Sequence, residues 1–326
     1  MSELLLGVDG GNTKCVALLA RPDGAVVGAG RAGCADIYNT TPEPALAEIE
    51  AAVRRALAAA DAVPGDVVSA LFSLAGADWP EDFELLREEL SRRLPGMARV
   101  EVVNDALGAL RAGTDDGVGL AVVCGTGGCV GARSPDGRVW HSSWWGLKTG
   151  GWALGTTALD AVYAAELGIA PATALTGAAL EVFGAATVEQ VLHSFTRRGG
   201  RPAFEASLLA PAVVRLAVAG DEVARRIVLE QGAALGDMAR AAARMVGLAG
   251  APYPLVLLGG VLRGEGAELL VDEIRARVPD GVPVQTRFEP AAGALLLAFD
   301  AADLAPELDR LAATVPGPEL FASATI

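Results

Sequence analysis

A short pattern of apolar strand, glycine-containing turn and second apolar strand occurs twice in this chain, about a hundred residues apart. Each copy continues into a Pro-Asp-Gly turn and a third apolar stretch, so each predicts a three-stranded meander. Glycines in the first turn leave backbone N–H groups uncovered, and such groups bind anions. The duplication therefore predicts two lobes whose turns face each other and grip the phosphates of a nucleotide. The two turns are Asp9-Gly10-Gly11-Asn12-Thr13-Lys14 and Gly125-Thr126-Gly127-Gly128.

The spacing of apolar residues after each meander predicts alternating helices and strands. The expected fold class is therefore α/β, with a mixed sheet flanked by helices in each lobe. A glycine-rich loop at 113–117 suggests a boundary between an N-terminal lobe, 1–116, and a C-terminal lobe, 117–326. The last dozen residues are expected to form a loosely held tail. Helices are predicted over 40–61, 81–93, 106–112, about 265–278 and 290–300, strands over 67–74, 100–103, 254–258 and about 282–285, and a helical insertion over about 153–245.

Charge and hydropathy limit the partners that we expect. Apolar residues make up 52% of the 326 residues, yet no stretch of 18 uncharged apolar residues and no signal peptide is found. We therefore expect a cytoplasmic protein with no membrane partner. The net charge of -14 also disfavours nucleic acid, because an acidic surface gains nothing from counterion release.

Cysteine and histidine offer little chemistry. The four cysteines have no CxxC spacing, and we interpret them as buried reduced thiols. With only two histidines, an HExxH zinc site is impossible and a catalytic triad based on histidine is not expected.

Two aspartates are candidates for phosphoryl transfer. Asp9 could hold hydrated Mg²⁺ while Thr13 or Lys14 touches phosphate oxygens, although a plain hairpin with a solvated Asp and Lys has the same sequence. Asp105 ends a predicted buried strand and opens a helix. It could be an N-cap, or the general base that accepts a proton from a substrate hydroxyl as that oxygen attacks ATP.

Other glycine and tryptophan motifs are less specific. Gly28 to Gly33 matches GxGxxG, but no helix is predicted after it, so we interpret the match as chance. Gly259-Gly260 is either a strand-to-helix turn or a flat surface for the adenosine of ATP. Three tryptophans among glycines are either core aromatics or faces for a sugar ring; they are Trp144, Trp145 and Trp152.

Together these motifs resemble the sugar kinase, Hsp70 and actin superfamily, and within it the N-acetylglucosamine kinase and BadF-type ATPase family. The resemblance implies the two-lobed ribonuclease H-like (actin-like ATPase) fold and use of ATP. The family's D-G-G-x-T motif matches Asp9 to Thr13, and its catalytic aspartate with a following alanine matches Asp105-Ala106. Its G-T-G-S motif matches Gly125-Thr126-Gly127, and its adenosine motif matches Gly259-Gly260.

Three positions depart from the family pattern. The sugar-contacting asparagine falls on Asp36, with Asn39 close enough to substitute, and the serine of the second phosphate loop is Gly128. The family's G-W-G followed by G-D-E-G appears as Trp145-Gly146 followed by Gly150-Gly151-Trp152-Ala153, so both acidic residues are absent. A carboxylate at position 36 would suit a free amino group better than an acetamide.

The resemblance implies an ATP- and Mg²⁺-dependent kinase for an amino sugar such as N-acetylglucosamine or glucosamine, and a homodimer is expected because many relatives form one. One alternative is an ATPase that activates a partner protein, and another is a nucleotide-binding regulator without catalysis. Asp105 is expected to act as the base, and Asp9 to hold the metal through water. The expected sugar contacts are Asp36, Asn39, Gly76, Asp78, Asp105, Trp145 and Gly146.

Overall fold

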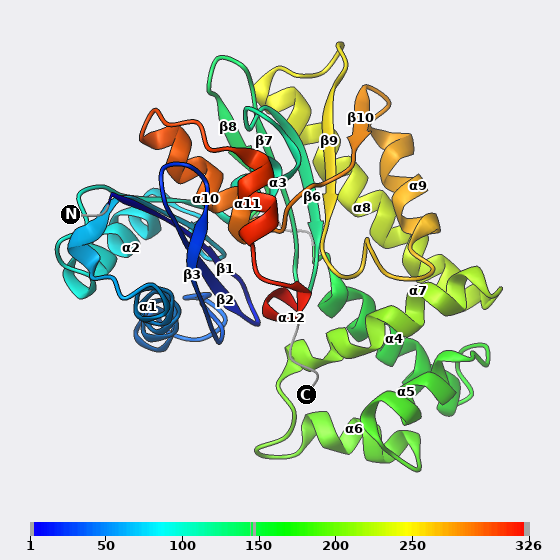
Figure 1. The fold of residues 1–326 in the computed structure, drawn as a ribbon. Helices are drawn as coiled ribbons and strands as arrows, with labels where there is room; N and C mark the ends of the chain where they lie inside the picture. The colour runs from blue at the N-terminus through cyan, green and yellow to red at the C-terminus, as the bar shows by residue number, and fades with distance from the viewer. Residues whose placement is uncertain (1–2, 144, 146–147, 323–326) are drawn as a thin grey trace. The chain divides into compact units, whose positions relative to one another are not determined.

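The computed structural model describes residues 3–143, 145 and 148–322 (Figure 1). Its strands are β1 Leu4–Gly10, β2 Cys15–Ala20, β3 Val26–Ala32, β4 Val67–Leu74, β5 Val100–Asn104, β6 Gly119–Cys124, β7 Gly128–Arg133, β8 Val139–His141, β9 Tyr253–Leu258 and β10 Gly281–Val284. Its α-helices are α1 Pro42–Ala59, α2 Pro80–Arg93, α3 Asp105–Gly113, α4 Gly151–Glu166, α5 Leu175–Phe183, α6 Val188–Thr196, α7 Ala210–Val218, α8 Glu222–Val246, α9 Glu268–Arg277, α10 Pro290–Ala301, α11 Leu308–Thr314 and α12 Pro318–Phe321, and its 3₁₀ helices are η1 Pro64–Asp66 and η2 Ala203–Leu209.

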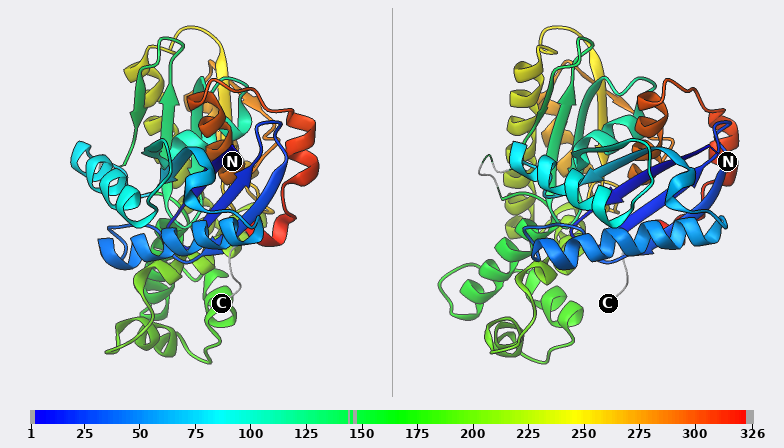
Figure 2. Two further views of the ribbon diagram at one scale, coloured as in Figure 1. Left: turned by 60° about the vertical axis from the view of Figure 1, so that its left-hand side comes forward. Right: turned by 90° about the vertical axis from the view of Figure 1, so that its left-hand side faces the viewer.

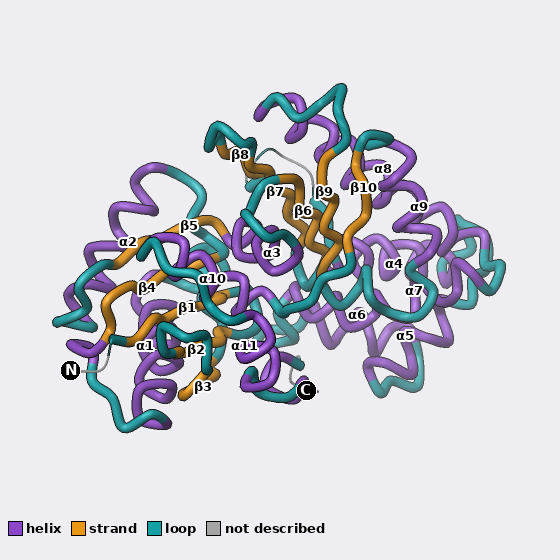
Figure 3. The backbone as a smooth tube through the Cα atoms, turned by 45° about the horizontal axis from the view of Figure 1, so that its top comes forward, coloured by secondary structure: helices purple, strands orange, loops and turns teal. Residues whose placement is uncertain are grey.

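The strands form two five-stranded sheets, with the orders β3-β2-β1-β4-β5 and β10-β9-β6-β7-β8 (Figure 3). In the first sheet β1, β2 and β3 pair antiparallel, whereas β4 and β5 run parallel to β1. In the second sheet the three consecutive strands β6, β7 and β8 also lie side by side, and β7 and β8 are antiparallel. The repeated meander and the predicted fold class are therefore confirmed.

The chain forms two compact units. One comprises Met1–Ala121, Gly131–Ser143 and Pro283–Ile326, and the other comprises Val122–Val130 and Trp144–Val282. The lobe boundary expected between residues 116 and 117 lies between the two copies of the repeated sequence pattern. It stays a prediction.

One face of the first sheet packs against α1 and α2. Alternate residues of β1, Leu4, Leu6 and Val8, point into this core because side chains alternate across a strand. Helix α1 contributes apolar residues at helical spacing and packs against β2 and β3, and both views of Figure 2 show it below these strands. These helix residues are Leu46, Ile49, Val53 and Leu57, as the sequence predicts.

The glycines of the GxGxxG match serve this packing. A Cβ on Gly28 would lie 2.1 Å from the carbonyl oxygen of Ala56, and one on Gly30 would lie 2.0 Å from that of Ala52. Both glycines let α1 approach β3, and no helix directly follows the motif. The interpretation of this match as chance is therefore confirmed.

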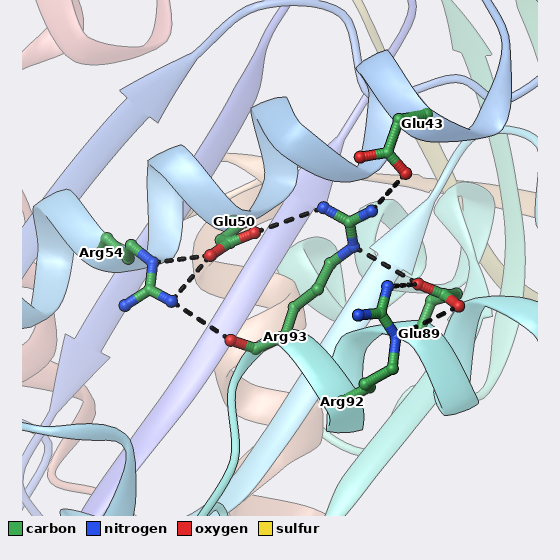
Figure 4. A network of polar contacts seen from close by, with 6 residues as sticks. All are labelled: Glu43, Glu50, Arg54, Glu89, Arg92 and Arg93. Carbon is green, nitrogen blue, oxygen red and sulfur yellow. Dashed lines mark hydrogen bonds and ion pairs between the residues drawn. The ribbon is translucent and has the colours of Figure 1, made fainter.

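Charged residues join α1 to α2 on the outside of this core (Figure 4). The side chain of Arg93 is only 10% exposed, and its guanidinium contacts Glu43 at 2.5 Å, Glu50 at 3.4 Å and Glu89 at 3.5 Å. Arg54, which is 56% exposed, pairs with the other oxygen of Glu50 at 2.7 Å. Arg93 is thus the cation shared by three carboxylates from two helices.

The opposite face of the first sheet packs against α10. A Cβ on Gly7 would lie 2.1 Å from the backbone nitrogen of Leu295, so the apolar helix α10 sits directly on β1. The Ser69 hydroxyl donates to the carbonyl oxygen of Ala298 at 2.9 Å and fixes α10 on β4. At the far end, Arg111 of α3 binds both carboxylate oxygens of Asp300, at 2.8 and 3.1 Å.

The expectation of a loosely held C-terminal tail is wrong for its described part, 315–322. This segment contains α12, and its carbonyl groups accept hydrogen bonds from two cations of the β1–β3 meander. Arg31 donates to Glu319 and Leu320, at 3.2 and 3.3 Å, and Lys14 donates to Phe321. Carbonyls at a helix C-terminus attract cations, which explains the contact.

Helices make up most of the second unit. Helix α8 packs against α7 and α9, and α4 packs against η2. Within the described residues no single helix is long and apolar enough to cross a membrane; one pair, Ala203–Val218 with Glu222–Val246, passes only when taken together across a 111° bend.

Candidate functional site

The carboxyl ends of β1, β4 and β5 meet at one edge of the first sheet. Asp9 is in register with Ser73, and Leu74, one residue further, is in register with Asn104. Neighbouring strands lie about 4.8 Å apart, so this pairing brings the first turn and the start of α3 to one edge. Ligands of open α/β sheets bind at such an edge.

The first turn is tied to the loops that follow β3 and β4. Gly11 closes the turn by donating its N–H to the carbonyl of Lys14 at 2.8 Å. The carbonyls of Gly10 and Gly11 accept from Ala75 and Ala35, at 2.7 and 3.0 Å. One turn thus holds both loops that carry the predicted sugar contacts.

The two glycines of this turn have different roles. A Cβ on Gly10 would lie 2.5 Å from the side chain of Leu74, so packing requires glycine there. A Cβ on Gly11 would meet nothing closer than 3.6 Å, so its missing side chain leaves backbone accessible. Asn12 is half-buried and Thr13 is exposed, and the carbonyl of Asn12 accepts a hydrogen bond from the amide of Asn39 at 3.4 Å.

Asp9 lies half-buried at the end of β1. Burial raises its pKa from 3.8 to about 6, the charge of Lys14 opposes this shift, and Glu289 adds to it. The described residues contain no group of three or more His, Cys, Asp or Glu side chains able to hold a metal. Mg²⁺ in phosphate-transfer sites needs only one or two carboxylates beside water and phosphate oxygens, so a lone Asp9 fits this ion.

The helix α3 opens with Asp105, but its N-cap is Asn104. The Asn104 side-chain oxygen accepts from the N–H of Ala106 at 3.2 Å, so the N-cap alternative for Asp105 is wrong. Ser73 supports this turn from β4, because its hydroxyl accepts from the N–H of Gly108 at 3.2 Å. Asp105 is half-buried in the first turn of the helix.

Asp36 and Gly76 touch each other. A Cβ on Gly76, whose φ is +82°, would lie 2.8 Å from Oδ1 of Asp36. That oxygen also accepts the N–H groups of Tyr38 and Asn39, at 2.8 and 3.3 Å, so the carboxylate orders its own turn. Burial raises the pKa of Asp36, and the two N–H groups oppose the shift.

Asp78 belongs to a hydrogen-bond network that the sequence analysis missed. Its Oδ1 accepts from the Ser143 hydroxyl at 2.7 Å and from the amide of Asn104 at 3.1 Å, and Ser143 lies 2.5 Å from Nδ1 of His141. Burial lowers the pKa of His141. The available signal was weak: a polar His-Ser-Ser run directly before the tryptophans of the family motif.

In the second unit, the turn after β6 rests on the start of α4. The carbonyls of Gly125 and Thr126 accept from the N–H groups of Gly151 and Trp152, at 2.8 and 2.7 Å. A Cβ on Gly150, whose φ is +98°, would lie 2.2 Å from the backbone of Gly127. Since the turn's carbonyls point to the helix, α4 sets the orientation of its peptide groups.

This contact explains why glycine replaces the family's serine at position 128. A Cβ on Gly128 would lie 2.5 Å from the hydroxyl of Thr149, and that hydroxyl donates to the carbonyl of Gly128 at 3.3 Å. A Cβ on Gly125, by contrast, would meet nothing closer than 4.0 Å, so this part of the turn is open to a ligand.

The Gly259-Gly260 motif lies beside the same turn. Gly259 has a φ of +101°, and a Cβ there would lie 2.3 Å from the carbonyl oxygen of Cys124, the last residue of β6. That carbonyl accepts the N–H of Val261 at 3.1 Å. Gly260 is exposed, and nothing lies within 4 Å of a Cβ built on it. The predicted phosphate and adenosine contacts of this unit are therefore neighbours.

The tryptophan motif is described only in part. Trp144 and Gly146 lie outside the described residues, whereas Trp145 is 66% exposed. Trp152 donates its backbone N–H to the turn, and the ammonium of Lys148 lies 5.5 Å from its ring centroid. Gly151 and Trp152 thus occupy the positions where the family pattern has acidic residues, and the ammonium of Lys148 contacts the ring of Trp152.

Within the described residues none of the four cysteines forms a disulfide, and Cys15 and Cys124 are buried. Burial raises the pKa of Cys124 to about 12 and that of Cys15 well above its usual value, so both thiols stay protonated at neutral pH. The interpretation as reduced, buried thiols is confirmed for these two; Cys34 and Cys129 are half-buried.

The model of the BadF/BadG/BcrA/BcrD ATPase family matches residues 6–298. The chain belongs to this family. It is 26% identical over 314 residues to the N-acetyl-D-glucosamine kinase of Dictyostelium discoideum, covering 91% of this chain and 98% of that one. It is 25% identical over 309 residues to the N-acetylmuramic acid/N-acetylglucosamine kinase of Clostridium acetobutylicum, covering 92% of this chain and 100% of the relative.

A solved structure shares the fold. It is a candidate N-acetylglucosamine kinase from Chromobacterium violaceum, 24% identical, with a TM-score of 0.67 over 91% of this chain and 99% of the other. The two-lobed fold expected from the resemblance is confirmed. The role of each site residue, and the grip of both turns on one triphosphate, stay predictions.

Proposed function

We propose that this protein is an ATP-dependent kinase that transfers a phosphoryl group to a hydroxyl of an amino sugar such as N-acetylglucosamine or glucosamine. The family supports the use of ATP, and two kinases of such sugars align with this chain over nearly their whole length. The observation that carries the proposal is the edge of the first sheet. There a helix opening with Asp105 stands beside the turn of Asp9 and the loops of Asp36 and Asp78.

In this proposal Asp105 accepts the proton of the attacking sugar hydroxyl. Phosphoryl transfer needs little covalent help, so one carboxylate and well-placed backbone N–H groups suffice. No side chain covers the backbone at Gly11, Gly125 and Gly260. The N–H groups of Gly11 and Gly125 already donate to the carbonyls of Lys14 and Gly127, at 2.8 and 2.9 Å, so in this proposal other N–H groups of the two turns meet the phosphates. Asp9 would hold Mg²⁺ through water, and the bound ion would supply positive charge against the phosphate oxygens.

The same proposal includes a homodimer working in the cytoplasm, without nucleic acid or membrane partners. The net charge of -14 supports the absence of polyanionic partners.

The test is ATP consumption by the purified protein against a panel of sugars, with the Asp105→Asn variant beside it. We expect ADP formation only when an amino sugar is present, and no turnover in the variant although it still binds ATP. Sugar-independent consumption would instead favour an ATPase that acts on a partner protein. Unchanged turnover in Asp105→Asn would remove the base assignment.

A further inference from the structure

The side chains around Asp78 form a chain that no motif of the sequence indicates. Oδ1 of Asp78 accepts hydrogen bonds from Ser143 at 2.7 Å and from Asn104 at 3.1 Å. The donors come from the start of α3 and from the segment after β8. Two donors from different elements fix the rotation of a carboxylate far better than one.

The direction of these bonds gives each residue its role. A carboxylate only accepts, so the Ser143 hydroxyl proton points to Asp78. The Ser143 oxygen then accepts from His141, which must carry its proton on Nδ1. The order His141, Ser143, Asp78 places serine in the middle, whereas a hydrolase triad places histidine there, so this is not a nucleophile being activated.

The ring of His141 is itself held in place. It packs edge-on against Phe83 of α2, with the ring centroids 6.3 Å apart and the planes at 69°. The preceding residue of α2, Asp82, is 5% exposed and accepts the N–H of Asp78 at 3.3 Å. The backbone and the carboxylate of Asp78 are thus both fixed.

Asn104 couples this network to the proposed base. Its amide nitrogen contacts Asp78, the carbonyl of Ala77 at 3.2 Å and the hydroxyl oxygen of Ser143 at 3.4 Å, while its oxygen caps the helix that begins with Asp105. Asn104 is 3% exposed, so little rotational freedom remains. One buried amide therefore sets the position of Asp78 relative to Asp105.

We infer that Ser143 and His141 are positioning residues, which hold the carboxylate of Asp78 for the contact with a sugar hydroxyl that is expected of it. This inference rests on the proposed kinase function. A carboxylate already oriented by the protein loses less conformational entropy on binding a hydroxyl, so its contribution appears in the affinity for sugar. The affinity for ATP does not depend on it.

The experiment compares Ser143→Ala with Ser143→Thr, which retains the hydroxyl. We expect Ser143→Ala to raise the KM for sugar about tenfold, as for loss of a hydrogen bond to a charged group, with the KM for ATP and kcat within about twofold. The KM for sugar of Ser143→Thr should stay close to that of wild type. His141→Asn, which keeps a donor at the Nδ1 position, should stay closer to wild type than His141→Phe, which keeps only the ring.

A matched control is Ser134→Ala. Ser134 is also buried, at 2% exposed, and its hydroxyl is bonded within the β7–β8 turn, so its loss affects stability without touching Asp78. An equal rise of the sugar KM in Ser134→Ala would overturn the inference. So would an unchanged sugar KM in Ser143→Ala when wild type phosphorylates the sugar.

A double-mutant cycle decides whether Ser143 acts through Asp78. In the Asp78→Asn background, Ser143→Ala should add little to the sugar KM, and the same two changes should couple in the free energy of unfolding. Full additivity in both readouts overturns the positioning role. Failure of the proposed function looks different: wild type forms no ADP with any sugar, and the coupling in unfolding persists.

Discussion

Gly293 of α10 lies so close to Gly108 of α3 that a Cβ on Gly293 would come within 1.9 Å of the Gly108 carbonyl oxygen. Because α10 also sits on β1, this contact sets the height of α3, and with it Asp105, above the strand ends. We expect Gly293→Ala to destabilise the protein by about 2 to 4 kcal/mol, through overpacking of backbone, and to lower kcat. Urea unfolding and sugar-dependent ADP formation measure the two effects.

Gly177→Ala is the control for this prediction. Gly177 lies in helix α5, and nothing stands within 4 Å of a Cβ built there. Alanine should stabilise this helix by about 0.5 to 1 kcal/mol, so a loss of stability comparable to that of Gly293→Ala would contradict the packing argument.

Substitution by alanine should destabilise the protein at Gly259 but not at Gly260. Gly259→Ala places a Cβ against the backbone of Cys124 at a positive φ, so we expect a loss of about 2 kcal/mol or more in the free energy of unfolding. Gly260→Ala meets open space and should leave stability within about 0.5 kcal/mol. If Gly260 contacts adenosine, its variant should raise the KM for ATP about three- to tenfold, measured at saturating sugar.

The sequence predicts the scaffold of the site better than its side-chain contacts. Strand β4 has the predicted bounds, and Asp9 and Asp105 stand at strand ends as expected, because hydrophobic periodicity determines where strands end. The bond between Asp78 and Ser143 joins residues 65 positions apart, and no local pattern records it. Likewise, only tertiary neighbours reveal that Gly128 is required for packing while Gly125 faces open space.

Arg93 should matter more for stability than its neighbour Arg54. Arg93→Ala leaves three carboxylates of α1 and α2 without their shared, mostly buried cation, and we expect a loss of about 1 to 2 kcal/mol. Arg54→Ala removes an exposed i,i+4 pair and should cost less than about 0.5 kcal/mol. Urea unfolding at low and high salt measures both, and equal costs would show that Arg93 is not the centre of the network.

Asp9→Asn should abolish activity and should raise the free energy of unfolding by an amount that depends on pH. The pKa of Asp9 is about 6 in the folded protein, above the 3.8 of an unperturbed carboxyl, because burial disfavours the charged form. The stability that Asp9 contributes is therefore complete below about pH 3.8 and is lost as the pH rises through about 6. Above that pH the variant should be more stable than wild type by on the order of 2 kcal/mol, since one pKa unit corresponds to about 1.36 kcal/mol and Asp9 is partly exposed.

The free energies of unfolding of wild type and Asp9→Asn should converge as the pH falls towards about 4. The sugar-dependent turnover of the variant should be lost at every pH. Addition of Mg²⁺ and ATP should raise the melting temperature of wild type more than that of Asp9→Asn, because only the wild-type carboxylate can hold the ion. Urea unfolding across this pH range is the measurement. A stability difference independent of pH would mean that the carboxylate is not strained by burial, and full activity of the variant would remove Asp9 from the metal site.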